Sequence, residues 1–499
     1  MGMPELLSSE TLLPQIAHAD LVAQLAAVLP AASLLHERED LKPFECDGMT
    51  AYQRVPLMVA LPENEDQVRS VLRICHQGRV PVVFRGAGTG LSGGALPYAQ
   101  GLLLVMAKMK KIIHIDPVAR MARVQPGVRN AAISEATAPY GLYYAPDPSS
   151  QIACSIGGNV AENSGGVHCL KYGLTVHNIL KLRFVTIEGE LLEIGSEGLD
   201  SPGYDLLALI TGSEGMLGVV TEVTVKLLPK PEKAQVVLAA FDHIVKAGQA
   251  VADIIGAGII PAGLEMMDKK ATAAVEQFVR AGYPLDAAAI LLCESDGAAE
   301  EVEDEIERVK EVMKNAGATE IRTSRDETER LKFWAGRKAA FPAVGRIMPD
   351  YYCMDGTIPK KQLPYVLKRI DELSEQFNLQ CANVFHAGDG NLHPLIMFDA
   401  NEGDQNERAE AYGAAILELC VEVGGTITGE HGVGIEKINQ MCVQFNTNEL
   451  KTFHAVKKVF DEHGLLNPGK AVPTLQRCAE FGAMHVRRGQ EKFPDLPRF

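Results

Sequence analysis

The 499-residue sequence lacks any run of about 18 apolar residues, so it predicts no transmembrane helix. Its first residues, MGMPELLSSE, lack a basic stretch followed by an apolar one, and Leu6 stands where a myristoylation site needs Ser or Thr. Basic residues do not balance the acidic ones, and the formal net charge of −16 argues against a nucleic-acid-binding surface. We therefore expect a cytoplasmic protein that does not bind nucleic acid.

Closely spaced cysteines are also lacking, because the ten cysteines are scattered and no two form a CxxC pair. An iron–sulfur cluster needs several closely spaced thiolates, so any cluster that works with this protein is expected on another polypeptide. We expect the ten cysteines to stay reduced in the cytosol. The content of 46% hydrophobic and 22% charged residues is typical of a globular protein.

Changes in the residue pattern divide the chain into four segments. Residues 1–50 are expected to be helical, and residues 51–230 are rich in glycine and short β-like runs. A Pro- and Lys-rich break at 228–234 marks the boundary. Residues 231–455 alternate strand-like and helical patterns, which predicts an α+β layer of antiparallel strands with helices on one side. Residues 456–499 form a C-terminal segment.

Two amphipathic helices follow from the spacing of apolar residues. EDQVRSVLRICHQGR, residues 65–79, lies between two strand-like runs. Residues 300–317 have the second pattern, and their acidic side is expected to face solvent. The apolar face of this second helix is formed by Val302, Ile306, Val309 and Met313.

The first glycine-rich loop follows an apolar strand in VPVVFRGAGTGLSGGALP, residues 80–97, and contains a formal GxGxxG motif. A Rossmann nucleotide site needs a helix to begin at the last glycine, but Pro97 and Gly101 follow almost at once. The sequence therefore favours a loop whose bare backbone amides wrap a diphosphate. The alternative is a flexible surface loop.

Two further glycine-rich loops occur in the same β-rich region. PDPSSQIACSIGGNVAENSGG covers residues 146–166, and ITGSEGMLGVVTEVTV covers residues 210–225. Three such loops predict one long ligand that is held at several points.

NVFHAGDGNLHPLI, residues 383–396, contains two histidines around a turn signal. With Asp389 and Gly390 as a two-residue turn, His386 lies opposite His393, and their Cβ atoms are roughly 5 Å apart. Two imidazoles in this position could bind one metal ion. The alternative is a structural hairpin whose histidines are satisfied by other contacts.

ITGEHGVG, residues 427–434, offers a carboxylate and a further histidine. Glu430 could complete a site of two histidines and one carboxylate, while His431 meets a substrate. The alternative is a connecting loop with solvated side chains. Arg337, near the only tryptophan, could clamp a carboxylate, although ordinary helix-surface charge explains an arginine equally well.

Six motifs together resemble a known family. RGAGTGLSGGA, DPSS…IGGNVAENSGG and TGSEGMLGVVTEVTVKLLPKP resemble the FAD-binding domain of the vanillyl-alcohol oxidase superfamily. FHAGDGNLHP, TGEHGVGIEK and LLNPGK resemble its FAD-linked 2-hydroxyacid branch. The resemblance runs from about residue 45 to the C-terminus, is closest to glycolate-oxidising members, and extends to D-lactate and D-2-hydroxyglutarate dehydrogenases.

The resemblance implies an α+β fold. Residues 51–230 would form a bipartite FAD-binding domain of the vanillyl-alcohol oxidase type. Residues 231–455 would form a substrate, or cap, domain with an antiparallel sheet and a metal site. Residues 456–499 would be a helical segment that returns to the FAD-binding domain, after the N-terminal helical segment 1–50 at the other end of the chain.

The resemblance also implies the roles of individual residues. His386, His393 and Glu430 would bind a divalent metal, zinc or another first-row ion. His431 would be the catalytic base, and Arg337 would clamp the substrate carboxylate. FAD would be bound non-covalently, since the first loop has no histidine, although His168 follows the second loop. The residues implied to contact FAD are Arg85, Gly86, Ala87, Gly88, Thr89, Gly90, Ser92, Gly93, Pro146, Ser155, Gly157, Gly158, Asn159, Gly215, Val219 and Asn467.

The implied reaction is oxidation of a small 2-hydroxyacid, glycolate or D-lactate, to glyoxylate or pyruvate, with transfer of a hydride to flavin. The implied partners are a second FAD-type subunit and an iron–sulfur subunit in a membrane-associated complex that passes electrons to quinone. This complex would hold the protein at the inner face of the membrane. Cys353 stands where the hydroxyglutarate branch has a lysine, which favours a small monoacid. The alternatives are a D-lactate or D-2-hydroxyglutarate dehydrogenase that acts alone, a non-redox flavin-dependent transferase, and a FAD-binding assembly subunit without chemistry.

Overall fold

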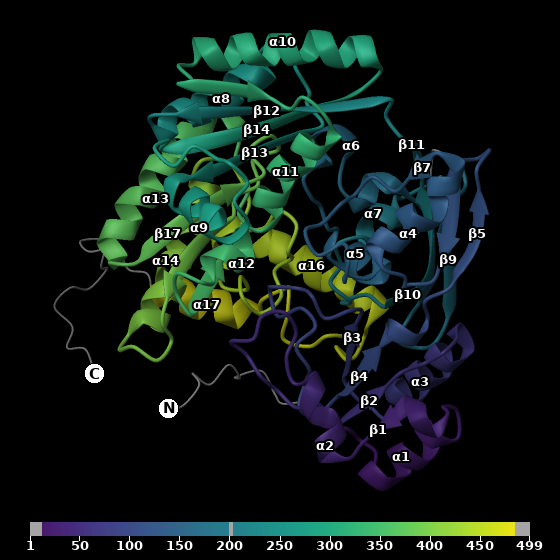
Figure 1. The fold of residues 1–499 in the computed structure, drawn as a ribbon. Coiled ribbons are helices and arrows are strands. Elements are labelled where there is room, and N and C mark those ends of the chain that lie inside the picture. The colour runs from purple at the N-terminus through teal and green to yellow at the C-terminus, as the bar shows by residue number, and fades with distance from the viewer. Residues whose placement is uncertain (1–11, 199–202, 485–499) are drawn as a thin grey trace, which may run out of the picture.

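The computed structural model describes residues 12–198 and 203–484 of the chain. Within these ranges the strands form sheets of four, five, two and seven strands. The seven-stranded sheet and its helices make up the upper part of the molecule in Figure 1, and the N-terminal sheets lie below it and to its right. No helix of the described residues is long and apolar enough to cross a membrane.

The four-stranded sheet has the order β1-β2-β4-β3, in which β2 and β3 run parallel to β4 and β1 runs antiparallel to β2. Helix α3, Glu65–Gln77, covers it because an apolar side chain falls on one face at each turn. The helix predicted at 65–79 is thus confirmed. The described part of the N-terminal segment, residues 12–50, is only partly helical, since it also supplies β1. The elements are α1 His18–Ala26, β1 Leu34–Leu35, α2 Arg38–Leu41, β2 Met58–Ala60, β3 Val82–Arg85 and β4 Leu102–Val105.

The five-stranded sheet is antiparallel, with the order β5-β6-β10-β8-β9. Between β3 and β4 the chain forms a loop without a helix, as expected for a site that is not of the Rossmann type. The elements of this region are β5 Ile112–Asp116, β6 Met121–Val124, α4 Asn130–Thr137, β7 Leu142–Tyr143, α5 Ile156–Glu162, α6 Cys169–Tyr172, β8 Ile179–Val185, β9 Leu191–Gly195, α7 Leu206–Ile210, β10 Val219–Lys226 and β11 Leu228–Pro229.

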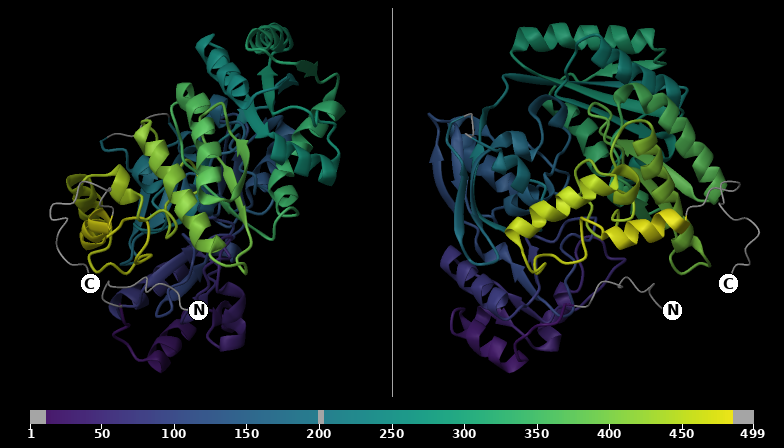
Figure 2. Two further views of the ribbon diagram at one scale, coloured as in Figure 1. Left: turned by 90° about the vertical axis from the view of Figure 1, so that its left-hand side faces the viewer. Right: turned by 180° about the vertical axis from the view of Figure 1, so that it is seen from behind.

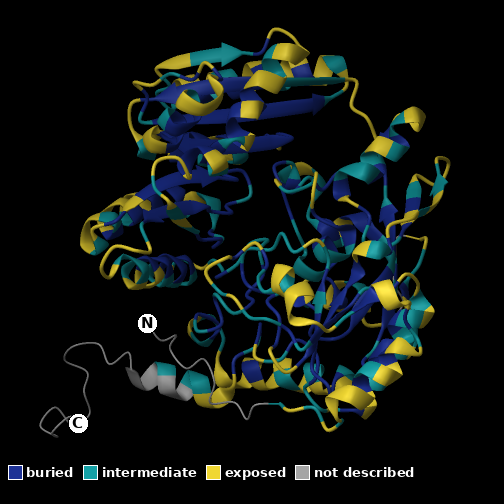
Figure 3. Cartoon of the chain, turned by 60° about the horizontal axis from the view of Figure 1, so that its bottom comes forward, coloured by how far each residue is buried: buried dark blue, intermediate teal, exposed yellow. Residues whose placement is uncertain are grey.

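The seven-stranded sheet is antiparallel and has the order β15-β12-β14-β13-β17-β18-β16. The helices cover both of its faces, so the prediction of helices on one side is wrong. The reason is that β12 and β14 bury successive residues on both faces, which only a double cover can shield from water. Figure 3 shows these strands in the colour of buried residues.

The strands of this sheet are β12 Lys233–Phe241, β13 Gly263–Asp268, β14 Ala289–Gly297, β15 Glu320–Thr323, β16 Asp350–Cys353, β17 Gln380–Phe385 and β18 Pro394–Phe398. One face packs against α8 Ile244–Gly256, α10 Ala299–Asn315, α13 Leu363–Phe377 and α14 Gln405–Glu422, and the other against α9 Lys269–Val279, α11 Glu327–Lys338 and α12 Ala340–Val344. The predicted apolar face of α10 is confirmed, since all four of its members are buried.

The chain returns to the N-terminal sheets after α16, Thr447–Phe460, which is yellow in Figure 2. The backbone amide of Val82 in β3 donates to the carbonyl of Leu465, and that of Asn467 donates to the carbonyl of Val82. The cysteines do not all stay reduced as expected. Cys442 in α15, Met441–Gln444, is bonded to Cys478 in α17, Leu475–Met484, because the fold brings their Cα atoms to 5.3 Å.

A charged contact joins the second glycine loop to the seven-stranded sheet. His168 Nδ1 lies 2.8 Å from Asp147 Oδ2, and its Nε2 lies 3.2 Å from Glu294 Oε1 on β14. Glu294 also accepts hydrogen bonds from Arg330 and Trp334 on α11. Burial opposes the charge, but the two carboxylates raise the pKa of His168 well above its ordinary value.

This contact makes stability depend on pH. The stabilisation from charged His168 is complete below about pH 6.5, the pKa of a histidine in an unfolded chain, and is lost as pH rises through the raised pKa of the folded state. We expect His168→Gln to lower the stability by about 1–3 kcal/mol at pH 6 and to flatten the pH dependence of the melting temperature. His114→Gln, at an exposed position on β5, is the control. If the melting temperatures of the wild type and His168→Gln change with pH in the same way, this assignment is contradicted.

Candidate active site

One cavity touches all three glycine loops. It lies where the loop after β3, the loop before α5 and the loop before β10 approach one another. His393, Glu430, His431 and Phe341 belong to the same lining. The residues implied to contact FAD that line this cavity are Arg85, Gly86, Ala87, Gly88, Thr89, Gly90, Ser155, Gly157, Gly158, Asn159, Gly215 and Val219.

The other four residues implied to contact FAD are not part of the cavity lining. Ser92 Oγ donates to the carbonyl of His431 at 2.8 Å, and Gly93 packs against Ile435. Pro146 accepts a hydrogen bond from the side chain of Asn130. Asn467 Nδ2 donates to the carbonyls of Gly94 and Glu214, so it ties the first loop to the third. Of these four residues, Asn467 joins two of the glycine loops, and the others attach a loop to a neighbouring segment.

The cavity wall fits a diphosphate. A Cβ atom at Gly86 would lie 2.2 Å from Ser155 Oγ, so only glycine lets the first two loops come this close. Arg85 is buried, and its Nε has no hydrogen-bond partner among the described residues. A buried guanidinium with a free donor beside bare backbone is suited to a phosphate oxygen.

The register of the histidine hairpin differs from the prediction by two residues. His386 pairs with Asn391, so the two-residue turn is wrong and a four-residue turn of residues 387–390 closes the hairpin. The amide of Gly388 donates to the carbonyl of Leu264 on β13, which keeps the chain on its neighbouring strand for longer than a tight turn allows. A shift of two residues keeps side chains on the same face, so the two histidine rings still meet, with centroids 5.0 Å apart.

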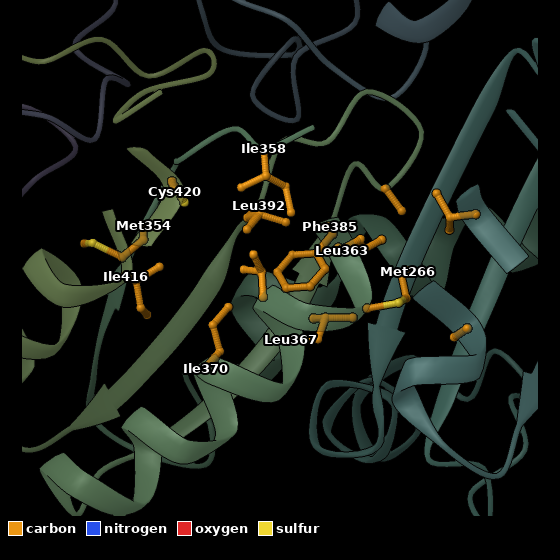
Figure 4. Close-up of a cluster of buried hydrophobic side chains, with 14 of the residues drawn as sticks. Met266, Met354, Ile358, Leu363, Leu367, Ile370, Phe385, Leu392, Ile416 and Cys420 are labelled. Carbon is orange, nitrogen blue, oxygen red and sulfur yellow. The ribbon is translucent and has the colours of Figure 1, made fainter. Parts of the chain in front are cut away.

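The apolar neighbours of the two histidines determine which way the rings point. Phe385 and Leu392 lie in the core cluster in Figure 4, with Leu363 and Leu367 of α13. Side chains alternate along a strand, so the histidines beside Phe385 and Leu392 face the other side of the sheet. Burial of Phe385 and Leu392 therefore holds the two histidine rings on the opposite face of the sheet.

Three atoms with free electron pairs converge at the hairpin. The Nε2 atoms of His386 and His393 lie 3.2 and 3.1 Å from Glu430 Oε1. The Nδ1 atom of His386 lies 2.7 Å from Glu265 Oε1, and the Nδ1 atom of His393 lies 3.3 Å from the carbonyl oxygen of Met354. Since those partners only accept hydrogen bonds, each Nδ1 carries a proton, and in the neutral imidazole each Nε2 has a free lone pair. Three acceptors in one place repel one another unless a proton or a metal ion lies between them, and this donor set fits a divalent metal.

The ionisation of this cluster agrees with a requirement for positive charge. Burial would raise the pKa of Glu430, but the neighbouring His386 and His393, when protonated on Nε2, hold it well below its usual range. Burial would lower the pKa of His386, but Glu265 and Glu430 raise it well above its ordinary value. Glu430 thus remains charged, and its charge favours a positive charge at the two rings, which a proton or a metal ion can supply.

Asp355 positions the turn that carries Glu430 and His431. Its carboxylate accepts the backbone amides of Gly429, Glu430 and His431 at 3.0, 3.1 and 3.0 Å. The ring of His431 stacks on that of His393, and its Nδ1 has no partner among the described residues. Burial lowers the pKa of His431 to about 4, so the imidazole is neutral and has a free lone pair.

Arg337 does not line the cavity. Its Nε donates to Glu265 Oε2 at 2.7 Å, and Glu265 Oε1 accepts from His386, so one carboxylate bridges the arginine and the histidine. The NH2 group of Arg337 is buried without a partner among the described residues. Arg337 is therefore attached to the histidine cluster and keeps one free donor.

The sequence reasoning missed several residues of the site. Glu265 and Asp355 are fully or almost fully buried, and both organise the cluster. A signal for Glu265 was present, because it is a single acidic residue inside the apolar strand GLEMMD. No local pattern distinguishes Asp355, whose partners are about 75 residues away in the sequence. Phe341 and Glu162, which line the cavity, were also missed.

Two family models match the chain. The model described as "FAD binding domain" matches residues 56–195, and the model described as "FAD linked oxidases, C-terminal domain" matches residues 230–471. The predicted α+β class with a FAD-binding domain of the vanillyl-alcohol oxidase type is confirmed.

Similar proteins are found among curated sequences and solved structures. The chain is 65% identical over 487 residues to the glycolate oxidase subunit GlcD of Escherichia coli (strain K12), with 98% of each chain covered. It is 30% identical over 461 residues to the D-lactate dehydrogenase of Anaerostipes hadrus, with 90% of this chain and 97% of that one covered. Its fold matches p-cresol methylhydroxylase with a TM-score of 0.77 at 17% identity, with 92% and 97% covered. The last likeness concerns the fold alone.

Removal of one member of the converging cluster should abolish metal binding. We expect His386→Ala and Glu430→Ala to lose bound divalent metal, measured by elemental analysis, because two remaining protein ligands hold such an ion weakly. Bound FAD, measured from its absorbance, should be retained. His114→Ala, at an exposed position, should keep both. An unchanged metal content in His386→Ala and Glu430→Ala would refute the site.

Proposed function

This chain belongs to the FAD-linked oxidases, and we propose that it oxidises a small 2-hydroxyacid, glycolate or D-lactate, to the corresponding 2-oxoacid. The observation that carries the proposal is that the glycine loops and the cluster of His393, Glu430 and His431 line one cavity. A substrate there lies beside both a flavin and a proton acceptor. The chemistry that bound FAD supplies is acceptance of a hydride.

Residues of the chain would bind the metal, take the hydroxyl proton and bind the substrate carboxylate. His386, His393 and Glu430 would hold a divalent metal, whose chemistry when bound is to polarise the 2-hydroxyl group and lower its pKa. His431 would take the hydroxyl proton on its free Nδ1. The resemblance assigns Arg337 to the substrate carboxylate; its Nε is held by Glu265 and its NH2 group is free for this contact, although the side chain lies outside the cavity lining.

The size of the substrate is suggested by Cys353. Its thiol, His393 and His431 offer atoms that all lie within 4.8 Å of one another, so position 353 adjoins the proposed reaction centre. Burial raises the pKa of the thiol well above its ordinary value, so the side chain is neutral. A neutral group here offers no charge to a second carboxylate, which favours a monoacid over a diacid such as 2-hydroxyglutarate.

Electrons would leave through partner proteins. The described free cysteines are scattered through the fold and form no cluster-binding group, and one similar protein is named as a subunit. We infer an iron–sulfur subunit and a second FAD-type subunit that pass electrons to quinone. These partners would hold the protein at the cytoplasmic face of the membrane.

A panel of short 2-hydroxyacids tests the proposed function. Purified protein should have a flavin spectrum that bleaches with glycolate or D-lactate, and it should turn over with an artificial electron acceptor. L-Lactate and D-2-hydroxyglutarate are the controls for handedness and for a second carboxylate. The proposal is contradicted if the folded protein contains no flavin, or if none of these acids reduces the flavin.

His431→Gln tests the base. The substitution keeps a polar side chain of similar size but removes the imidazole, so the rate of flavin reduction should fall about 10²–10⁴-fold. Rapid mixing with substrate measures this rate, while metal and FAD contents should stay unchanged. His454→Gln, whose ring bonds to the carbonyl of Pro473, is the matched control. A rate within a few fold of wild type would assign the proton to another acceptor.

A further inference from the structure

Glu162, the last residue of α5, lies in the cavity wall and has no part in the proposed reaction. Its Oε2 is shielded from solvent and has no hydrogen-bond partner among the described residues. A Cβ atom at Gly94 would lie 2.9 Å from Glu162 Oε1, and one at Gly432 would lie 2.1 Å from its Oε2. Two glycines from distant parts of the chain therefore make room for this one carboxyl group.

A second carboxyl group, that of Glu214, lies beside it. A Cβ atom at Gly432 would lie 3.0 Å from Glu214 Cδ, so this position adjoins both side chains. The two groups differ in their partners, since Glu214 accepts the backbone amides of Val433 and Gly434, each at 2.7 Å. Neighbouring carboxyl groups in a buried site do not both ionise readily. Burial raises the pKa of both groups, but the amides of Val433 and Gly434 oppose this at Glu214, so Glu162 is the one that keeps its proton.

The ionisable groups around Glu162 are engaged elsewhere. Lys437 Nζ donates to the carbonyl of Gly432 and to Asp355, and Lys470 Nζ donates to the carbonyls of Gly94 and Leu96. Asp47 accepts the amides of Met49 and Ala95. Burial and the negative charge of Glu214 together raise the pKa of Glu162 well above its ordinary value.

We propose that Glu162 is a neutral carboxylic acid that donates a hydrogen bond to the flavin ring and thereby favours flavin reduction. Glu162 adjoins Gly432, next to His431, so it lies in the part of the cavity where hydride transfer is proposed. A reduced flavin carries more negative charge than an oxidised one, and a neutral donor stabilises that charge, whereas a carboxylate would oppose it. The inference rests on the proposed function only in that FAD fills this cavity.

Three variants test this role. Glu162→Gln keeps a neutral donor of the same size, Glu162→Ala removes the group, and Glu188→Gln is a control at an exposed position. The readouts are FAD per chain, the FAD dissociation constant, the flavin absorbance spectrum, and the flavin reduction potential as a function of pH. Thermal melting shows whether each variant is folded.

The variants are expected to differ in flavin reduction potential and in FAD binding. The potential of the wild type should show an additional fall at high pH, as Glu162 ionises beside the flavin, and Glu162→Gln should lack this fall while it retains FAD. Glu162→Ala should have a lower potential, a shifted spectrum and a FAD dissociation constant about tenfold higher, as for the loss of one hydrogen bond. Glu188→Gln should match the wild type.

Two negative outcomes can be distinguished. If the wild type and Glu162→Gln bind FAD with the same spectrum and the same pH dependence of potential, the inference is overturned and the proposed function stands. This comparison decides the question even if Glu162→Ala does not fold. If the folded wild type binds no FAD, the proposed function fails, and the inference fails with it.

Discussion

The carboxylate of Asp355 is the interaction on which the geometry of the candidate site depends. It is fully buried and accepts three consecutive backbone amides, the hydroxyl of Thr428 and a hydrogen bond from Lys437. Burial alone would raise its pKa, but the neighbouring His431, Lys437 and His393 side chains lower it below its ordinary value, so Asp355 stays ionised. Residues 428–431 have no helix or strand to fix their backbone. The positions of Glu430 and His431 are therefore set by one buried charge.

The same turn connects the two halves of the molecule. Gly165 of the second glycine loop donates its amide to Glu430 Oε2 at 3.0 Å, and Ser92 of the first loop donates to the carbonyl of His431. Glu214 of the third loop accepts the amides of Val433 and Gly434. Each loop implied to hold the cofactor thus bonds to the segment that carries the proposed base. Shared hydrogen bonds explain why the cofactor cavity and the histidine cluster have a common wall.

Local patterns were sufficient for much of the fold and for part of the site. The period of apolar residues gave α3 and the buried face of α10, and the proline after the first loop ruled out a Rossmann helix. Alternation along the hairpin predicted that His386 and His393 lie on one face of the sheet. This is correct although the predicted register is wrong by two residues. The double cover of the seven-stranded sheet was missed, because an apolar run in a strand was not taken as a sign of burial on both faces.

The sequence by itself determined which residue types could do chemistry: three glycine-rich loops, two histidines in a hairpin, and a Glu–His pair in a turn. Only the tertiary structure decided their partners. Glu265 bridges Arg337 and His386, and Glu162 lies beside Glu214, through contacts between segments that are far apart in the chain. Such pairings leave no local period, because they depend on where whole strands and loops dock. A buried carboxylate can be recognised in a sequence, but its protonation depends on donors that folding brings to it.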